Sequence, residues 1–69
     1  MMIEDLINRF TYHAPKAGQN DKYEEIRRYA LSFAKLLNDT CPDSREKSLA
    51  ITALEQAVMW ANASIARNE

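Results

Sequence analysis

The chain has 69 residues, of which 9 are Lys or Arg and 10 are Asp or Glu, and its net charge is -1. A near-neutral chain lacks the basic field that drives non-specific binding to DNA or RNA, so we expect neither among its partners. One Cys excludes an internal disulfide. The longest uncharged run, residues 56–66, is too short to span a bilayer, so we expect a cytoplasmic protein with no membrane partner. One Gly and two Pro leave few positions for tight turns, which argues against a β fold.

The N-terminal part of the chain is predicted to be a short helix followed by a linker. The helix covers about residues 3–9. Its apolar side chains recur at spacings of three and four, so that they share one face: Ile3, Leu6, Ile7 and Phe10. Residues 11–19 form the linker, because Pro15 and Gly18 interrupt a helix and the residue before a proline is driven into extended conformations.

A second helix is predicted over about residues 21–38. Asn20 is the expected N-cap, and the acids Asp21 and Glu24 suit the positive end of the helix dipole. One apolar stripe runs along this helix at helical spacing: Tyr23, Ile26, Ala30, Phe33 and Leu37.

The third predicted helix, about residues 43–67, is the longest. Asp43 and Glu46 are placed as a capping box at its start. Its apolar positions form a band that is wider than one partner helix needs: Ala50, Ile51, Leu54, Ala57, Val58, Ala61 and Ile65. The width of this band favours a second packing partner from another chain, although the alanines could also reflect helix propensity alone.

These elements predict an all-α fold in a single domain, residues 1–69, with a short N-terminal helix and an antiparallel two-helix hairpin. A chain of this size buries little apolar surface on its own, and it has no disulfide or metal cluster to compensate. We therefore expect it to assemble as a homo-oligomer.

The sequence shows no residue pattern that is typical of a catalytic site. The single His and the single Cys, His13 and Cys41, lie in the linker and in the turn between the second and third helices. No spacing suggests a catalytic triad, a metal site or a glycine-rich phosphate loop. We expect no enzymatic activity, no cofactor and no metal.

Rings and cations alternate in residues 9–16, which is a better functional signal. Phe10, Tyr12 and His13 could stack on nucleobases, and Lys16 could neutralise a phosphate. The alternative is that Phe10 and Tyr12 attach the linker to the helices.

For four residues of the two long helices, the sequence likewise allows either a ligand-binding role or a structural role. Arg27 could bind phosphate, or it could pair with acids one turn earlier on its helix. Asn62 could read a base edge or form a buried hydrogen bond that sets the helix register. Trp60 could fill an interface between chains or stack on a ligand, and Arg67 could suit the helix dipole or bind a ligand.

Three stretches, residues 9–16, 41–46 and 54–67, together resemble the hairpin domain of a family of phage anti-defence proteins that act as sponges. This domain is shared by the second type of anti-CBASS protein and the first type of Thoeris anti-defence protein. The C-terminal stretch, Leu-Glu-Gln-Ala-Val-Met-Trp-Ala-Asn-Ala-Ser-Ile-Ala-Arg, is the most specific. The sequence departs from the family pattern at Ala14, where a proline is expected, and we expect it to lack the extra N-terminal domain of the Thoeris type.

The resemblance implies a hexamer that holds cyclic di- or trinucleotides, or glycocyclic ADP-ribose, between protomers and performs no chemistry on them. The alternative is a small helical assembly or regulatory protein with protein partners only. The ligand-binding residues that we expect on this basis are Phe10, Tyr12, His13, Lys16, Gln19, Arg27, Trp60, Asn62 and Arg67.

Overall fold

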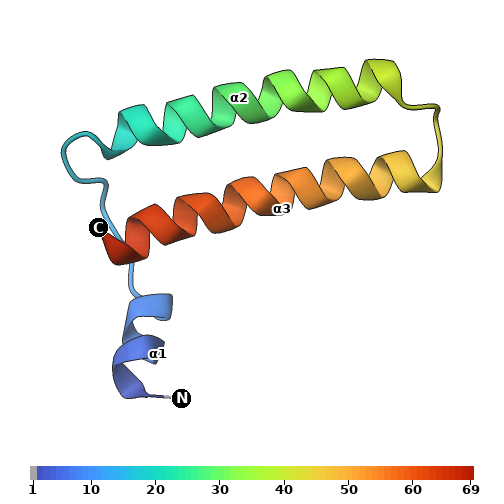
Figure 1. The fold of residues 1–69 in the computed structure, drawn as a ribbon. Coiled ribbons are helices and arrows are strands. Elements are labelled where there is room, and N and C mark those ends of the chain that lie inside the picture. The colour runs from blue at the N-terminus through green and yellow to red at the C-terminus, as the bar shows by residue number, and fades with distance from the viewer. Residues whose placement is uncertain (1) are drawn as a thin grey trace.

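The computed structural model describes residues 2–69, and this part of the chain contains three α-helices and no strand (Figure 1). Helix α1 spans Ile3–Phe10, α2 spans Gln19–Thr40 and α3 spans Arg45–Asn68. The all-α prediction is confirmed. None of the described helices is long and apolar enough to cross a membrane.

Helices α2 and α3 lie side by side and antiparallel, and α1 projects from the end where α2 begins and α3 ends (Figure 1). The principal-axis extents of the Cα atoms are 45 × 29 × 13 Å. The smallest extent is less than a third of the longest, as expected for a flat arrangement of helices. Residues 2–69 therefore form a single layer of helices, in which no second layer covers either face of α2 and α3.

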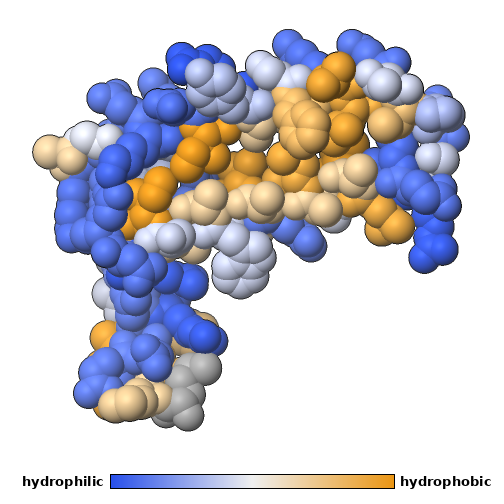
Figure 2. Space-filling model, viewed as in Figure 1, coloured by the Kyte–Doolittle hydropathy of each residue, from blue (hydrophilic) through white to orange (hydrophobic). Residues whose placement is uncertain are grey.

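The seam between α2 and α3 holds most of the apolar contacts, and Figure 2 shows hydrophobic side chains gathered along it. No hydrophobic residue among residues 2–69 is buried. The side chains that meet at the seam reach only intermediate burial: Ile26, Ala30, Leu37, Ile51, Leu54, Val58 and Ile65. Large side chains beside the seam stay exposed, among them Tyr29 and Phe33 at 64% and 51%.

The exposed surface is larger than that of a compact protein of this size. The chain exposes 5714 Å², whereas a folded monomer of 7.9 kDa exposes about 4,400 Å². The excess of about 1,300 Å² is more than the roughly 800 Å² that one partner contributes to a standard protein–protein interface.

Helix α2 begins two residues earlier than predicted, so the assignment of Asn20 as its N-cap is wrong. Gly18 occupies the N-cap position with a φ of 84°, in the left-handed region that glycine adopts without strain. The side chain of Gln19 then accepts a hydrogen bond from the Lys16 N–H at 2.9 Å, and the Gln19 N–H donates to the Lys16 carbonyl at 3.0 Å. Asn20 therefore lies inside the first turn.

Helix α3 is capped by Ser44 and not by the predicted pair of Asp43 and Glu46. The Ser44 hydroxyl accepts a hydrogen bond from the Lys47 N–H at 3.1 Å and donates to the Pro42 carbonyl at 3.0 Å. Asp43 instead accepts from the Lys47 ammonium group at 2.8 Å, and Lys47 also donates to the Asn38 carbonyl at 2.8 Å. Lys47 thus links the end of α2 to the start of α3.

Replacing Ser44 by Ala should lower the free energy of unfolding by about 1 kcal/mol, because the N-terminal amides of α3 lose their side-chain acceptor. Urea denaturation at one fixed protein concentration measures this loss. Asp43→Ala is the matched control and should cost less, since the Asp43 carboxylate is fully exposed. An equal or larger loss for Asp43→Ala would contradict Ser44 as the cap.

Candidate functional site

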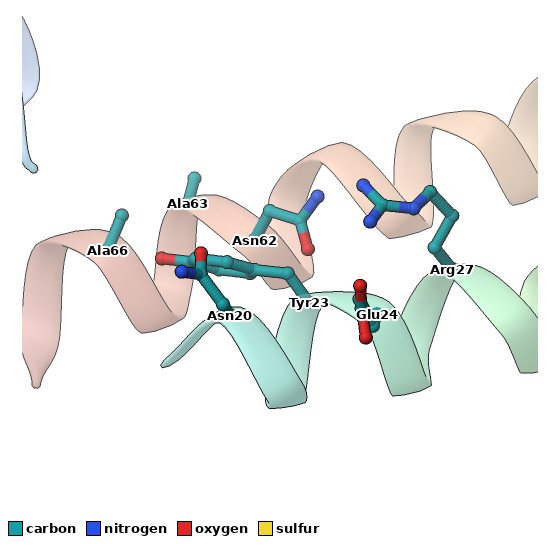
Figure 3. Close-up of a pocket in the computed structure, with 7 residues that line it drawn as sticks. All are labelled: Asn20, Tyr23, Glu24, Arg27, Asn62, Ala63 and Ala66. Atoms are coloured by element: carbon teal, nitrogen blue, oxygen red, sulfur yellow. The ribbon is translucent and has the colours of Figure 1, made fainter. Parts of the chain in front are cut away.

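A groove with a polar lining crosses the seam near the start of α2 and the end of α3 (Figure 3). Its volume is about 540 Å³, which lies within the range of small-molecule sites. Side chains from both helices line it: Asn20, Tyr23, Glu24, Arg27, Asn62, Ala63 and Ala66.

Helical spacing brings the lining residues together. Tyr23 and Arg27 are four residues apart, and Glu24 lies three residues before Arg27, so these side chains share one face of α2. On α3, Ala63 and Ala66 are small and leave the space open. In Figure 3, Asn62 lies between the Tyr23 ring and the Arg27 guanidinium. The groove therefore presents an aromatic face, an amide and a cation to the same opening.

The amide of Asn62 has an unmet hydrogen-bonding requirement. Its Oδ1 atom is buried and has no hydrogen-bond partner. A buried acceptor without a donor is costly, and nearly all such atoms in folded proteins are paired. The structure therefore does not show the register-setting hydrogen bond that was one alternative for Asn62.

Arg27 forms no ion pair with the acids of the preceding turn. The ion pairs among residues 2–69 join Lys22 to Glu69 and Lys47 to Asp43. The neighbouring Arg28 instead lies over the Tyr29 ring, 5.4 Å from its centroid. The ion-pair alternative for Arg27 is therefore not found, and the guanidinium faces the groove without a carboxylate partner.

The predicted aromatic residues Phe10, Tyr12 and Trp60 lie outside this groove. Phe10 and Tyr12 are 85% and 83% exposed, and Trp60 is 69% exposed. The rings of Phe10 and Tyr12 therefore do not attach the linker to the helices, which was the alternative to ligand binding. All three rings are accessible to a ligand or to another chain.

Gln19 is the one buried residue of the described chain, with 3% of its surface exposed, and its side chain is engaged in internal hydrogen bonds. Besides its bond to Lys16, its Nε2 donates to the Ile65 carbonyl at 3.5 Å and to the Glu69 carboxylate at 3.4 Å. Gln19 thus ties the linker to the C-terminal end of α3.

Two other predicted ligand residues, His13 and Lys16, take part in the same attachment. His13 Nε2 donates to the Asn8 carbonyl at 2.8 Å, Asn8 Nδ2 donates to the Arg67 carbonyl at 3.3 Å, and Lys16 Nζ donates to the Glu69 carbonyl. The last carbonyls of a helix have no partner within it. Asn8 of α1 and Lys16 of the linker supply donors for these carbonyls, which explains why the two segments pack there.

The side chain of Arg67 is half-buried in the last turn of α3. It does not line the groove of Figure 3. Of the nine predicted ligand residues, the structure therefore brings two, Arg27 and Asn62, into one groove.

Sequence reasoning missed Tyr23, Glu24 and Asn20 as site residues. It assigned Tyr23 to the apolar stripe, Glu24 to the helix dipole and Asn20 to the cap. A usable signal was present, because positions 20, 23, 24 and 27 form one face of a helix and all four carry polar groups.

A family model matches residues 2–66, which is nearly the whole chain, and its description is Acb2/Tad1, hairpin domain. The chain belongs to this family. The expected resemblance to the anti-CBASS and anti-Thoeris proteins is thereby confirmed. No curated protein and no solved structure matches the chain. Among residues 2–69 there is no group of three or more side chains that could hold a metal ion.

The linker attachment also includes an ionised carboxylate. The hydrogen bond from Lys22 holds the pKa of Glu69 below its usual value of 4.5, and Gln19 adds to the effect. A lowered folded-state pKa means that the carboxylate stabilises the fold at pH values above about 4.5. This contribution is lost as the pH falls through the folded-state pKa.

Glu69→Gln should therefore lower the melting temperature at pH 7, and the difference from the unsubstituted protein should narrow as the pH falls below about 4.5. Calorimetry at pH 7 and pH 3 measures both values. Glu55→Gln is the control, since Glu55 lies on the middle of α3 and forms no ion pair among the described residues. A difference that persists unchanged at pH 3 would contradict the role of the Glu69 charge.

Proposed function

We propose that this protein binds cyclic nucleotide immune signals and sequesters them without cleaving them. Membership of the Acb2/Tad1 family implies a role in phage anti-defence. Sequestration in the cytoplasm of the infected cell would keep the signal from the effectors of CBASS or Thoeris defence. The candidate ligands are cyclic di- or trinucleotides and glycocyclic ADP-ribose.

The observation that carries this proposal is the convergence of Tyr23, Arg27 and Asn62 on one groove. A nucleotide offers a base to stack on a ring, a phosphate to pair with a guanidinium, and base-edge groups that can form a hydrogen bond with an amide. Arg27, which forms no ion pair among residues 2–69, is the group that such a ligand would complete.

The proposal includes self-assembly, and the surface of the chain supports it. The single layer of helices leaves about 1,300 Å² more surface exposed than a compact monomer has. Two apolar grooves flank the seam and share Ala30, Leu54 and Val58. Packing of further copies against these grooves would bury that surface, and six copies are what the family resemblance implies.

Assembly would also strengthen the site. Holding a scarce signal requires nanomolar affinity, about -12 kcal/mol. An open groove on one chain leaves much of a ligand in water. A neighbouring protomer could cover the ligand with an exposed ring such as Phe10, Tyr12 or Trp60, and a preformed pocket lowers the entropy lost on binding.

The second candidate function is a helical assembly protein with protein partners only, which the exposed apolar grooves also favour. Incubation with a panel of cyclic nucleotides, followed by desalting and heat release, separates the candidates. Recovery of the intact nucleotide supports sequestration, and a cleaved product would indicate a hydrolase. Absence of retention would favour the assembly protein.

Arg27→Ala should weaken cyclic nucleotide binding by about 1.5–3 kcal/mol, the usual contribution of hydrogen bonds to charged groups. Isothermal titration calorimetry measures the loss. The matched control is Arg28→Ala, because the Arg28 side chain lies over Tyr29 and does not line the groove. If Arg27→Ala leaves the binding affinity unchanged, the phosphate of the ligand does not bind in this groove.

Light scattering on the purified protein should give a mass several times 7.9 kDa, because self-association is the available means of covering the seam. The measurement should be repeated across a dilution series down to micromolar concentration. A folded monomer over this range would contradict both the assembly and a pocket formed between protomers.

A further inference from the structure

The groove contains a carboxylate whose role phosphate binding does not explain. Glu24 lines the groove together with Arg27, and its side chain is exposed. It belongs to neither ion pair of the described chain. A bare carboxylate repels a phosphate, so an anionic ligand gains from this groove only if it also offers Glu24 a hydrogen-bond donor.

The spacing of the two charges limits which ligand fits. Glu24 and Arg27 are three residues apart on α2, so their Cβ atoms lie about 5–6 Å from each other. Figure 3 shows both side chains at the same end of the groove. The ligand must therefore carry a donor and a phosphate on neighbouring positions.

A ribonucleotide with a 3′-phosphate has this arrangement, because its free 2′-hydroxyl is on the adjacent carbon of the sugar. Carboxylates of Asp and Glu commonly accept hydrogen bonds from ribose hydroxyls in nucleotide sites. A donor on the base lies farther from the phosphate. In Figure 3 the Tyr23 ring, which is suited to cover a base, lies on the other side of Asn62 from Arg27. This order places the sugar, and not the base, beside Glu24.

We propose, on the basis of the proposed function, that Glu24 accepts a hydrogen bond from the ribose 2′-hydroxyl next to the phosphate that Arg27 binds. The groove then selects ribonucleotide signals over their 2′-deoxy counterparts. A deoxy ligand leaves the carboxylate facing a phosphate with no donor between them, so it loses a hydrogen bond and retains the repulsion.

The test compares cyclic di-AMP, cyclic di-GMP and cyclic tri-AMP with their all-2′-deoxy forms by isothermal titration calorimetry. The unsubstituted protein should bind the ribonucleotide form of its ligand at least about tenfold more tightly, the scale of one hydrogen bond to a charged group. Glu24→Ala should bring the ratio of the two dissociation constants close to 1. Asp21→Ala, in the same part of α2 and outside this groove and both apolar grooves, should leave the ratio unchanged.

Arg27→Ala should weaken both forms, since both carry the phosphate. Equal affinity of the unsubstituted protein for the two forms would overturn the role of Glu24 and leave the proposed function intact. A preference that survives Glu24→Ala would also overturn it, because the hydroxyl would then be read elsewhere. Failure of all six compounds to bind would overturn the inference, whereas the proposed function is overturned only if the wider panel of cyclic nucleotides is not retained either. Circular dichroism and light scattering verify that each variant folds and assembles alike.

Discussion

The packing of α2 against α3 is the contact on which the rest of the structure depends, and it is incomplete within one chain. Two helices of 22 and 24 residues meet along a single seam of medium-sized side chains such as Ile26, Leu54 and Val58. A two-helix layer has no third element to cover its faces, so none of the hydrophobic residues from 2 to 69 becomes fully buried. The same geometry leaves both faces of the seam open to another copy.

Helix α1 and the linker are held by polar contacts, since they bring no buried apolar side chain to the molecule. Asn8 and Lys16 donate to the Arg67 and Glu69 carbonyls at the C-terminal end of α3. Gln19 donates to the Ile65 carbonyl, which also accepts from the Glu69 N–H. This attachment sets the direction of α1 and of the exposed rings of Phe10 and Tyr12. The orientation of the rings thus depends on hydrogen bonds that water can compete for.

The groove arises where the seam changes its composition. Toward the end of α3 the apolar band gives way to Asn62 and to two small alanines, while α2 contributes Tyr23 and Arg27. Small side chains leave space, and among residues 2–69 Asn62 Oδ1 has no hydrogen-bond partner and Arg27 has no ion-pair partner. The site is therefore a part of the helix interface that this chain does not fill or satisfy alone.

Helical periodicity in the sequence determined the three helices to within about two residues, because amphipathic spacing is a local property. Residue type, together with the family resemblance, also indicated Arg27 and Asn62 as candidate ligand residues. Gly18 and Ser44 cap α2 and α3 in place of the predicted residues. A cap depends on backbone angles that several neighbouring polar residues could adopt, so the sequence did not single out the right one. Only the tertiary structure showed that Gln19 is internal, since its partners lie 46 and 50 residues away. The groove, too, is visible only in the tertiary structure, because the start of α2 and the end of α3 come together only after the chain reverses direction.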